Sequence, residues 1–379
     1  MVKKIKVQLL ASPHPQFDEI IEFPPEGVEY KINRVKTQYH GWFTENRIRL
    51  HQKLISIFPL PRMTSTKSDA DIIHSTRGII QIKQKKSWIV DLETGHIFTS
   101  FNWKAMQNPI VKKIIMNALM SKNCKKILPQ SEAAKENFRL AIGEENFNKI
   151  KDKVEVLYLA LRSHKKKKIN RKDRNIVLSF VGRSFYGKGG PNLLKAYEIL
   201  TKKYKNLRLK YKGYIPEEWQ DFAKKLSGLE LVEGHFSRDK LFEKMYLSSD
   251  IYVMPTSKDN YGVVFLEAMS AGLPIVSTTS FTVPEIVKDG KNGFLVKTDL
   301  THENYFPYGK GQKYLKDVRR IDKNIVDQLV EKLSILIEDK KLREKMGRAG
   351  KKMIEDKNGK FSIEKRNKKL RKIYEEALK

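Results

Sequence analysis

The residues best suited to chemistry in this sequence lie in a glycine-rich loop at residues 182–190 (GRSFYGKGG). The loop follows an apolar run at 176–181 and precedes a helical pattern that begins at Pro191. A strand–turn–helix of this kind presents backbone N–H groups and a helix N-terminus, both of which bind phosphate. Arg183 and Lys188 add a planar guanidinium and a mobile ammonium, which together suit a diphosphate without a metal ion. Two ordinary surface cations on a turn would give the same pattern, so this alternative stays open.

The loop nearly matches the P-loop of nucleotide triphosphatases. Gly182, Gly187 and Lys188 have the right spacing, but Gly189 stands where Ser or Thr should hold magnesium. This difference argues against a triphosphatase. The loop also lacks the G-x-G-x-x-G pattern, so a dinucleotide cofactor is not indicated.

A second group of residues follows the apolar run that ends at Pro255. Asp259 lies in the expected loop, Gly262 permits close backbone approach, and Glu267 falls in the next helix. Glu267 shares a helix face with Val263, four residues earlier. Carboxylates accept hydrogen bonds from sugar and ribose hydroxyls, so the two acids suit recognition of a nucleotide sugar. A helix-start acid beside an unrelated surface glutamate is the alternative reading.

Taken together, these residues resemble the family 4 retaining glycosyltransferases of the GT-B fold. Arg183 and Lys188 match the family's arginine–lysine pair, and Asp259 and Glu267 match its E-x7-E motif with Asp in the first position. The resemblance is strong over 176–297 and weak over 1–125. Further matches to the family are GLPIV at 272–276, PEIV at 284–287, NGFLV at 292–296 and ILPQS at 127–131.

The resemblance implies an α/β protein of the GT-B fold, with two Rossmann-like doubly wound domains facing across a cleft and a C-terminal helix crossing back to the first. It implies that Arg183 and Lys188 bind the donor diphosphate, that Glu267 binds ribose hydroxyls, and that Asp259 holds the transferred sugar. The family retains the anomeric configuration and uses no metal, so we expect a nucleotide-diphosphate sugar as donor substrate, no metal site and no cofactor. The donor-binding residues expected are Gly182, Arg183, Lys188, Asp259, Tyr261, Gly262, Val263 and Glu267.

The first half departs from the family. Where members carry a glycine-rich loop after the first strand, residues 11–15 read ASPHP, with His14 as a weak substitute. Where many members place a histidine after a first-domain strand, this sequence has Glu93, with His96 close behind. We expect Glu93 to act catalytically, by contacting the acceptor or serving as a base, with a solvent-facing glutamate as the alternative. The metal-binding spelling D-x-D at 69–71 is interpreted as fortuitous.

Strand and helix patterns alternate along the chain, which predicts parallel sheets covered on both faces. A basic run within 162–175 is interpreted as a solvated linker, with a polyanion-binding patch as the alternative. The predicted domains are therefore 1–165 on the acceptor side, 166–360 for the nucleotide sugar, and a closing helix at 361–379. Expected strands are 3–10, 71–74, 87–92, 126–129, 154–159, 176–181, 207–211, 229–232, 250–254, 273–277 and 293–296; expected helices are 46–57, 109–121, 131–140, 191–203, 217–226, 238–247, 262–271 and the 324–379 tail, which ends in a helix at 361–378.

The chain is strongly basic, with a formal net charge of +31 over 379 residues. Such a charge attracts polyanions without choosing among them, and a lysine-rich coding bias would also produce it. One cysteine and the lack of a long apolar span predict a cytoplasmic protein. The basic stretch 104–126 leaves peripheral contact with an anionic membrane open, whereas nucleic acid is not expected. The alternative function is a non-catalytic GT-B-like module that binds nucleic acid or anionic membrane through its charge; epimerisation and phosphorolysis have no supporting residues.

Overall fold

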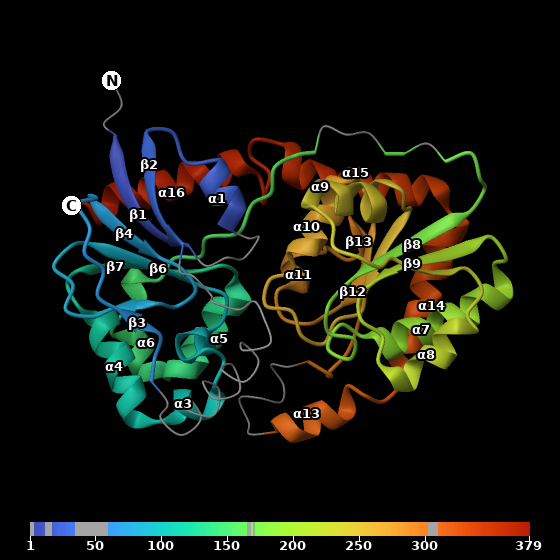
Figure 1. Ribbon diagram of the computed structural model, residues 1–379, viewed down its shortest axis with the longest axis horizontal. Coiled ribbons are helices and arrows are strands. Elements are labelled where there is room, and N and C mark those ends of the chain that lie inside the picture. The colour runs from blue at the N-terminus through green and yellow to red at the C-terminus, as the bar shows by residue number, and fades with distance from the viewer. Residues whose placement is uncertain (1–3, 12–16, 35–59, 165–167, 170, 302–309) are drawn as a thin grey trace. The chain divides into compact units, whose positions relative to one another are not determined.

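The computed structural model describes residues 4–11, 17–34, 60–164, 168–169, 171–301 and 310–379. The chain divides into two compact units, shown in Figure 1. The first unit comprises Met1–Leu159 together with Ile363–Lys379, and the second comprises Ala160–Ser362. The sequence placed these divisions at 165/166 and 360/361. Each unit contains a parallel sheet with helices, as the alternation of patterns predicted.

The first unit contains a five-stranded parallel sheet in the order β2-β1-β4-β6-β7. Every residue of β4 and β6 is buried, as expected for parallel strands covered on both faces. A separate two-stranded parallel pair joins β3 and β5. The strands are β1 (Ile5–Ala11), β2 (Val28–Arg34), β3 (Met63–Thr64), β4 (Ile72–Ser75), β5 (Ile80–Gln81), β6 (Trp88–Leu92) and β7 (Cys124–Pro129).

One face of this sheet packs against helices that follow β6 and β7. Ile73, Val90 and Ile127 contribute to this core from the strands. Asn108 caps α4 by accepting a hydrogen bond of 2.9 Å from the Ile110 N–H, and Pro109 occupies the first helical position. The helical segments of this unit, apart from the last, are α1 (Asp18–Glu22), η2 (Gly95–Thr99), α3 (Trp103–Gln107), α4 (Pro109–Met120), α5 (Glu132–Ile142), α6 (Glu144–Asn148) and η3 (Lys151–Lys153).

The opposite face of the same sheet is covered by the C-terminal helix α16 (Ile363–Ala377). Leu370 and Ile373 pack with Ile72 and Ile89, which alternate with the strand residues of the first core. The Tyr374 hydroxyl lies 2.7 Å from Nδ1 of the buried His74. Figure 1 shows α16, in red, across the sheet from α4 and α6. The last seventeen residues therefore belong to the core of the first unit.

The second unit contains a six-stranded parallel sheet in the order β10-β9-β8-β11-β12-β13. The chain runs outward from β8 to β9 and β10, then returns to the other side of β8 with β11. The order thus reverses between β8 and β11, and ligands of open α/β sheets bind at such a point beyond the carboxyl ends of the strands. The strands are β8 (Ile176–Val181), β9 (Leu207–Lys212), β10 (Leu229–Leu231), β11 (Ile251–Met254), β12 (Ile275–Thr278) and β13 (Gly293–Val296).

The helices of the second unit connect and cover these strands. The expected helix at 238–247 is α9 (Arg238–Leu241) continued by the π-helical segment η4 (Phe242–Leu247). Within the described residues, no helix is long and apolar enough to cross a bilayer. The other helices are α7 (Gly190–Lys203), α8 (Glu217–Lys224), α10 (Val263–Ser270), α11 (Val283–Ile286), α13 (Gly311–Asp317), α14 (Lys323–Glu338) and α15 (Lys340–Glu355).

The structure differs in part from the expected elements at three places. The strand expected at 154–159 is reduced to a parallel bridge between Val154 and Ile127. The chain still follows β7 there, because the Glu155 and Leu157 N–H groups donate to the Ile127 and Pro129 carbonyls at 3.0 and 2.8 Å. Strand β2 was overlooked, although VEYKINR alternates apolar with polar residues as a half-buried strand does. The linker is not simply solvated: Ile169 donates a hydrogen bond to the Leu247 carbonyl, and Arg171 forms an ion pair with Asp250. The helix predicted at 46–57 and His14 lie outside the described residues.

Candidate active site

The glycine-rich loop leaves β8 and enters α7 at the carboxyl edge of the second sheet. Gly189 has φ +76°, and a Cβ there would lie 2.0 Å from the Pro255 carbonyl oxygen. Only glycine permits both this backbone conformation and this approach. The loop after β8 is thereby held against the end of β11. No side chain caps the fourteen-residue helix α7, so the N–H groups of its first turn remain suited to an anion.

The two sequence motifs meet through an ion pair. The Lys188 ammonium lies 2.6 Å from Oδ2 of Asp259 and donates a second hydrogen bond of 2.8 Å to the Lys258 carbonyl. The Lys188 and Asp259 side chains are only 19% and 14% exposed. A cation of the phosphate loop and the first acid of the E-x7-E-like motif are therefore in direct contact, although 71 residues separate them in sequence.

A backbone carbonyl fixes the relative position of the two loops. The Gly187 oxygen accepts hydrogen bonds from the N–H groups of Ser257 and Lys258, at 3.0 and 3.1 Å. The hydroxyls of Thr256 and Ser257 donate to the same oxygen at 3.1 and 3.3 Å. All of these atoms belong to the loops after β8 and β11. The position of Lys188 beside Asp259 thus follows from a hydrogen-bonded framework and not from the two side chains alone.

Helix α10 begins directly after Asp259. Gly262 precedes it with φ +80°, and a Cβ there would lie 2.4 Å from the Phe265 ring. Tyr261 is buried and Val263 is half-buried at the start of the helix. No side-chain cap occupies the N-terminus of this helix. The first turn of α10 therefore offers N–H groups beside the Lys188–Asp259 pair.

Glu267 is held by two donors inside the second unit. The Tyr246 hydroxyl donates to Oε2 at 2.9 Å, and Nε of Arg238 lies 3.4 Å from Oε1. Burial raises the pKa of Tyr246 well above its usual value, and the charge of Glu267 raises it further. The phenol therefore stays protonated and donates. Tyr246 lies in the π-helical segment η4, an irregularity that is frequent at functional sites.

The predicted donor-binding residues thus lie on two loops that follow neighbouring strands and on helix α10, which carries Val263 and Glu267. The Arg183 guanidinium is exposed, and none of the described residues forms a hydrogen bond or ion pair with it. It carries a positive charge available to a ligand beside the already paired Lys188. Sequence reasoning missed Tyr246 and Arg238, because a tyrosine and an arginine on an amphipathic helix give no signal that they face Glu267.

Glu93 belongs to the first unit, immediately after β6. Its Oε1 accepts hydrogen bonds from Nε and Nη2 of Arg77, at 3.1 and 2.7 Å. Burial raises the pKa of Glu93, and the nearby Arg77 charge opposes that shift. The alternative of a solvent-facing glutamate is wrong, because Glu93 is only 3% exposed. His96 is also buried, and its ring contacts the Trp103 ring at a tilt of 38°.

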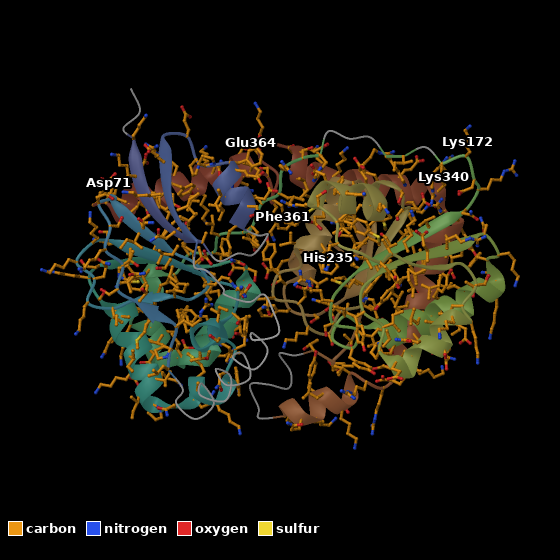
Figure 2. All side chains as sticks on the ribbon, viewed as in Figure 1. Asp71, Lys172, His235, Lys340, Phe361 and Glu364 are labelled. Carbon is orange, nitrogen blue, oxygen red and sulfur yellow. The ribbon has the colours of Figure 1, made fainter. Side chains whose placement is uncertain are left out.

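The D-x-D spelling lies at the other end of the first sheet. Asp71 precedes β4 and accepts a hydrogen bond from the Lys6 N–H, whereas Asp69 pairs with Lys31. Figure 2 shows Asp71 at the outer margin of the first unit. These contacts with neighbouring residues account for the positions of both aspartate side chains. In the part of the chain that the structure describes, no three His, Cys, Asp or Glu side chains gather as a metal site.

The chain is similar to known glycosyltransferases in sequence. Residues 162–305 match the family described as glycosyl transferases group 1. An uncharacterized glycosyltransferase of Haemophilus influenzae is 31% identical over 57% of this chain and 59% of its own length. Another, from Methanocaldococcus jannaschii, is 33% identical over 59% of this chain and 58% of its own length. The match thus spans less than two thirds of these relatives.

Solved structures resemble the fold over nearly the whole chain. HepE of Anabaena, solved with UDP and glucose, has a TM-score of 0.60 at 14% identity and covers 97% of this chain and 98% of its own. Sucrose-phosphate synthase of Thermosynechococcus elongatus has a TM-score of 0.64 at 12% identity, with 98% of both chains covered. At these identities the likeness shows the fold alone. The chain has the GT-B fold, and its residues 162–305, which carry the loops described above, match the glycosyl transferases group 1 family.

Proposed function

We propose that this protein is a glycosyltransferase of the hexosyltransferase type. It moves a sugar from a nucleotide-diphosphate donor to an acceptor, with retention of the anomeric configuration and without a metal ion. The observation that carries this proposal is the contact of Lys188 with Asp259, 2.6 Å apart, where the loops after β8 and β11 meet. Such a place combines positive charge for a diphosphate with a carboxylate for sugar hydroxyls.

The positive groups of the site suit the departing diphosphate. Sugar transfer separates an electron-poor sugar from an anionic leaving group, so fixed positive charge lowers the barrier. Arg183, Lys188 and the N-terminus of α7 supply such charge from the protein itself. In this proposal Arg183 binds the phosphates directly, and Lys188 divides its hydrogen bonds between the phosphate and Asp259.

The acidic groups suit the rest of the donor. Glu267, held by Tyr246 and Arg238, is proposed to accept hydrogen bonds from the ribose hydroxyls. Asp259 and the N–H groups from Tyr261 to Val263 are proposed to hold the transferred sugar. Glu93 is proposed to act on the acceptor side; with its carboxylate buried against Arg77, a fixed contact with an acceptor hydroxyl is favoured over free proton transfer.

The buried carboxylate supports transfer over charge-driven binding. A module that bound polyanions through its net charge of +31 would have no use for Glu267, which is buried and held by two donors.

HepE has also been solved with UDP-glucose, which makes a UDP-sugar the first donor to test. We propose a cytoplasmic location with peripheral contact to an anionic membrane, and nucleic acid is not proposed as a partner.

The proposal is tested by incubating the protein with UDP-, GDP- and ADP-sugars and measuring released nucleotide with and without EDTA. We expect release from one donor class, unchanged by EDTA. Arg183→Ala should reduce it by about a hundredfold, the usual effect of removing one group that stabilises a transition state. Glu267→Gln should reduce it by about tenfold at low donor concentration, because a hydrogen bond between the ribose and a charged group is worth about 1.5–3 kcal/mol.

Lys202→Ala is the matched control, because Lys202 is an exposed cation in the last turn of α7, far from the loop end of that helix. It should leave release unchanged. Abolition by EDTA would overturn the metal-free mechanism. Equal activity of Arg183→Ala and the parent protein would overturn the proposed donor site.

A further inference from the structure

Helix α4 exposes apolar side chains on the face turned away from the sheet. Ile110 is 71% exposed and Met120 is 41% exposed, while Lys113 and Asn117 are also exposed. These positions follow the helical spacing i, i+3, i+7 and i+10, so they form one stripe, here called the α4 face. The opposite side of the helix supplies the core residues Val111, Ile115, Met116, Ala118 and Leu119.

The sequence around this face contains cations and no acids. Residues 94–131 include six lysines and not one Asp or Glu, although the chain holds 44 acids in 379 residues. Lys113 lies within the α4 face, and the exposed Lys122 is two residues after Met120. No carboxylate in the described parts of the chain pairs with Lys104, Lys113 or Lys122. Their charge is therefore available to an anionic partner.

The turn before α3 presents another apolar group in the same acid-free stretch. Ser100 and Phe101 both have positive φ, +54° and +65°, a conformation that residues other than glycine rarely adopt. Asn102 then caps α3 by accepting a hydrogen bond of 3.0 Å from the Ala105 N–H. The Phe101 side chain is left 43% exposed, at the start of the helix that packs against α4.

We propose that the α4 face and Phe101 dock on an anionic lipid bilayer. The apolar side chains enter the boundary between headgroups and acyl chains, and Lys104, Lys113 and Lys122 contact the lipid phosphates. With only twelve residues, α4 lies in the plane of the interface and does not span it. This inference does not rest on the proposed sugar transfer.

Charge complementarity favours a bilayer over a second copy of the chain. A symmetric contact between two α4 faces would bring the cations of two copies together with no acid from 94–131 to balance them, which is unfavourable. A bilayer that contains acidic phospholipid supplies both negative charge and an apolar layer. It therefore matches both properties of the face.

The full chain can be tested by sedimentation with vesicles of phosphatidylcholine alone or mixed with phosphatidylglycerol. We expect binding only to the mixed vesicles, and weaker binding at high salt. The double variant Ile110→Ser, Met120→Ser should bind about tenfold more weakly, because the apolar anchor is lost while every charge remains. Both side chains are exposed, so thermal unfolding should match the parent protein.

Leu140→Ser is the matched control. Leu140 is 52% exposed on α5 of the same unit, but its helix carries Glu132 and Glu136. Loss of an exposed apolar group at this position should leave vesicle binding unchanged. An equal loss in both variants would overturn the assignment to α4.

A local readout follows from the single cysteine. Cys124 is buried, so Met120→Cys provides the accessible thiol for a polarity-sensitive fluorophore. We expect a blue shift on mixed vesicles with Met120→Cys and none with Leu140→Cys. Three results would overturn the proposal: the double variant binds mixed vesicles as strongly as the parent protein, the parent protein does not bind them at low salt, or the parent protein self-associates and the double variant does not.

Discussion

The Tyr246 hydroxyl donates a hydrogen bond of 2.9 Å to the Glu267 carboxylate. The tyrosine approaches from the π-helical segment η4, and the glutamate lies on α10. The orientation of Glu267 therefore depends on a segment that contains none of the recognisable motif. Variants of such a positioning residue can therefore distinguish an effect on ligand binding from an effect on folding.

Removing this hydroxyl should weaken nucleotide binding. In Tyr246→Phe the Glu267 carboxylate loses a buried donor, so we expect about tenfold weaker UDP binding, since a hydrogen bond to a charged group is worth about 1.5–3 kcal/mol. Isothermal titration with UDP measures the change. Tyr197→Phe is the control, because Tyr197 is equally buried but its hydroxyl donates to the Ser227 carbonyl at 2.9 Å. Equal losses in the two variants would mean a general packing effect.

Neutralising the paired acid should separate binding of the nucleotide from transfer of the sugar. Asp259→Asn removes the negative charge beside Lys188 and leaves a side chain of the same size. UDP should bind at least as tightly as before, because the ammonium is no longer neutralised, whereas turnover should fall by about a hundredfold. Titration and steady-state kinetics measure the two effects. Asp221→Asn, at an exposed pair with Lys224, should change neither; weaker UDP binding by Asp259→Asn would contradict this role.

The glycine at the meeting point of the two loops should not tolerate a side chain. Gly189→Ala combines a positive φ with a Cβ 2.0 Å from the Pro255 carbonyl, so one loop must move. We expect a loss of about 2–4 kcal/mol in the free energy of unfolding, measured with denaturant, and loss of UDP binding. Gly290→Ala isolates the backbone strain, because it has φ +72° and no atom within 4 Å of the added Cβ. It should lose only about 1 kcal/mol.

Acid should weaken the junction between the linker and the second unit. Burial tends to raise the pKa of Asp250, but Lys168, the Val177 N–H and Arg171 outweigh it and hold this pKa below the usual 3.8. A depressed folded-state pKa contributes stability above the unfolded value, and this stability is lost as pH falls through the folded pKa. The free energy of unfolding should therefore decline below about pH 4.

Asp250→Asn tests this assignment. The variant should be about 2 kcal/mol less stable near neutral pH, because hydrogen bonds to a charged group are lost. Its stability should then change less on acidification than that of the parent protein. Denaturant unfolding over a pH series measures both effects, and parallel pH profiles for the two proteins would contradict the role of Asp250.

Much of the local structure could be predicted from residue patterns. Apolar runs marked β6, β8 and β11, because buried parallel strands need apolar side chains on both faces. Asn108 with Pro109 and the serine at Ser131 marked helix starts, because capping is a local interaction. The same patterns overestimated the length of the pairing at 154–159 and overlooked β2, since pairing at a sheet edge depends on a neighbour that the local sequence does not reveal.

The sequence by itself determined the alternation of strands and helices and the chemistry of the two motifs, because periodicity, capping and glycine conformation act over a few residues. Only the tertiary structure decided that Lys188 contacts Asp259, that Tyr246 holds Glu267, and that Arg77 neutralises a buried Glu93. These contacts arise where neighbouring parallel strands bring their carboxyl ends to one edge or where a helix packs back on the sheet. The distance between two side chains is then set by the packing of whole elements, which no local pattern encodes.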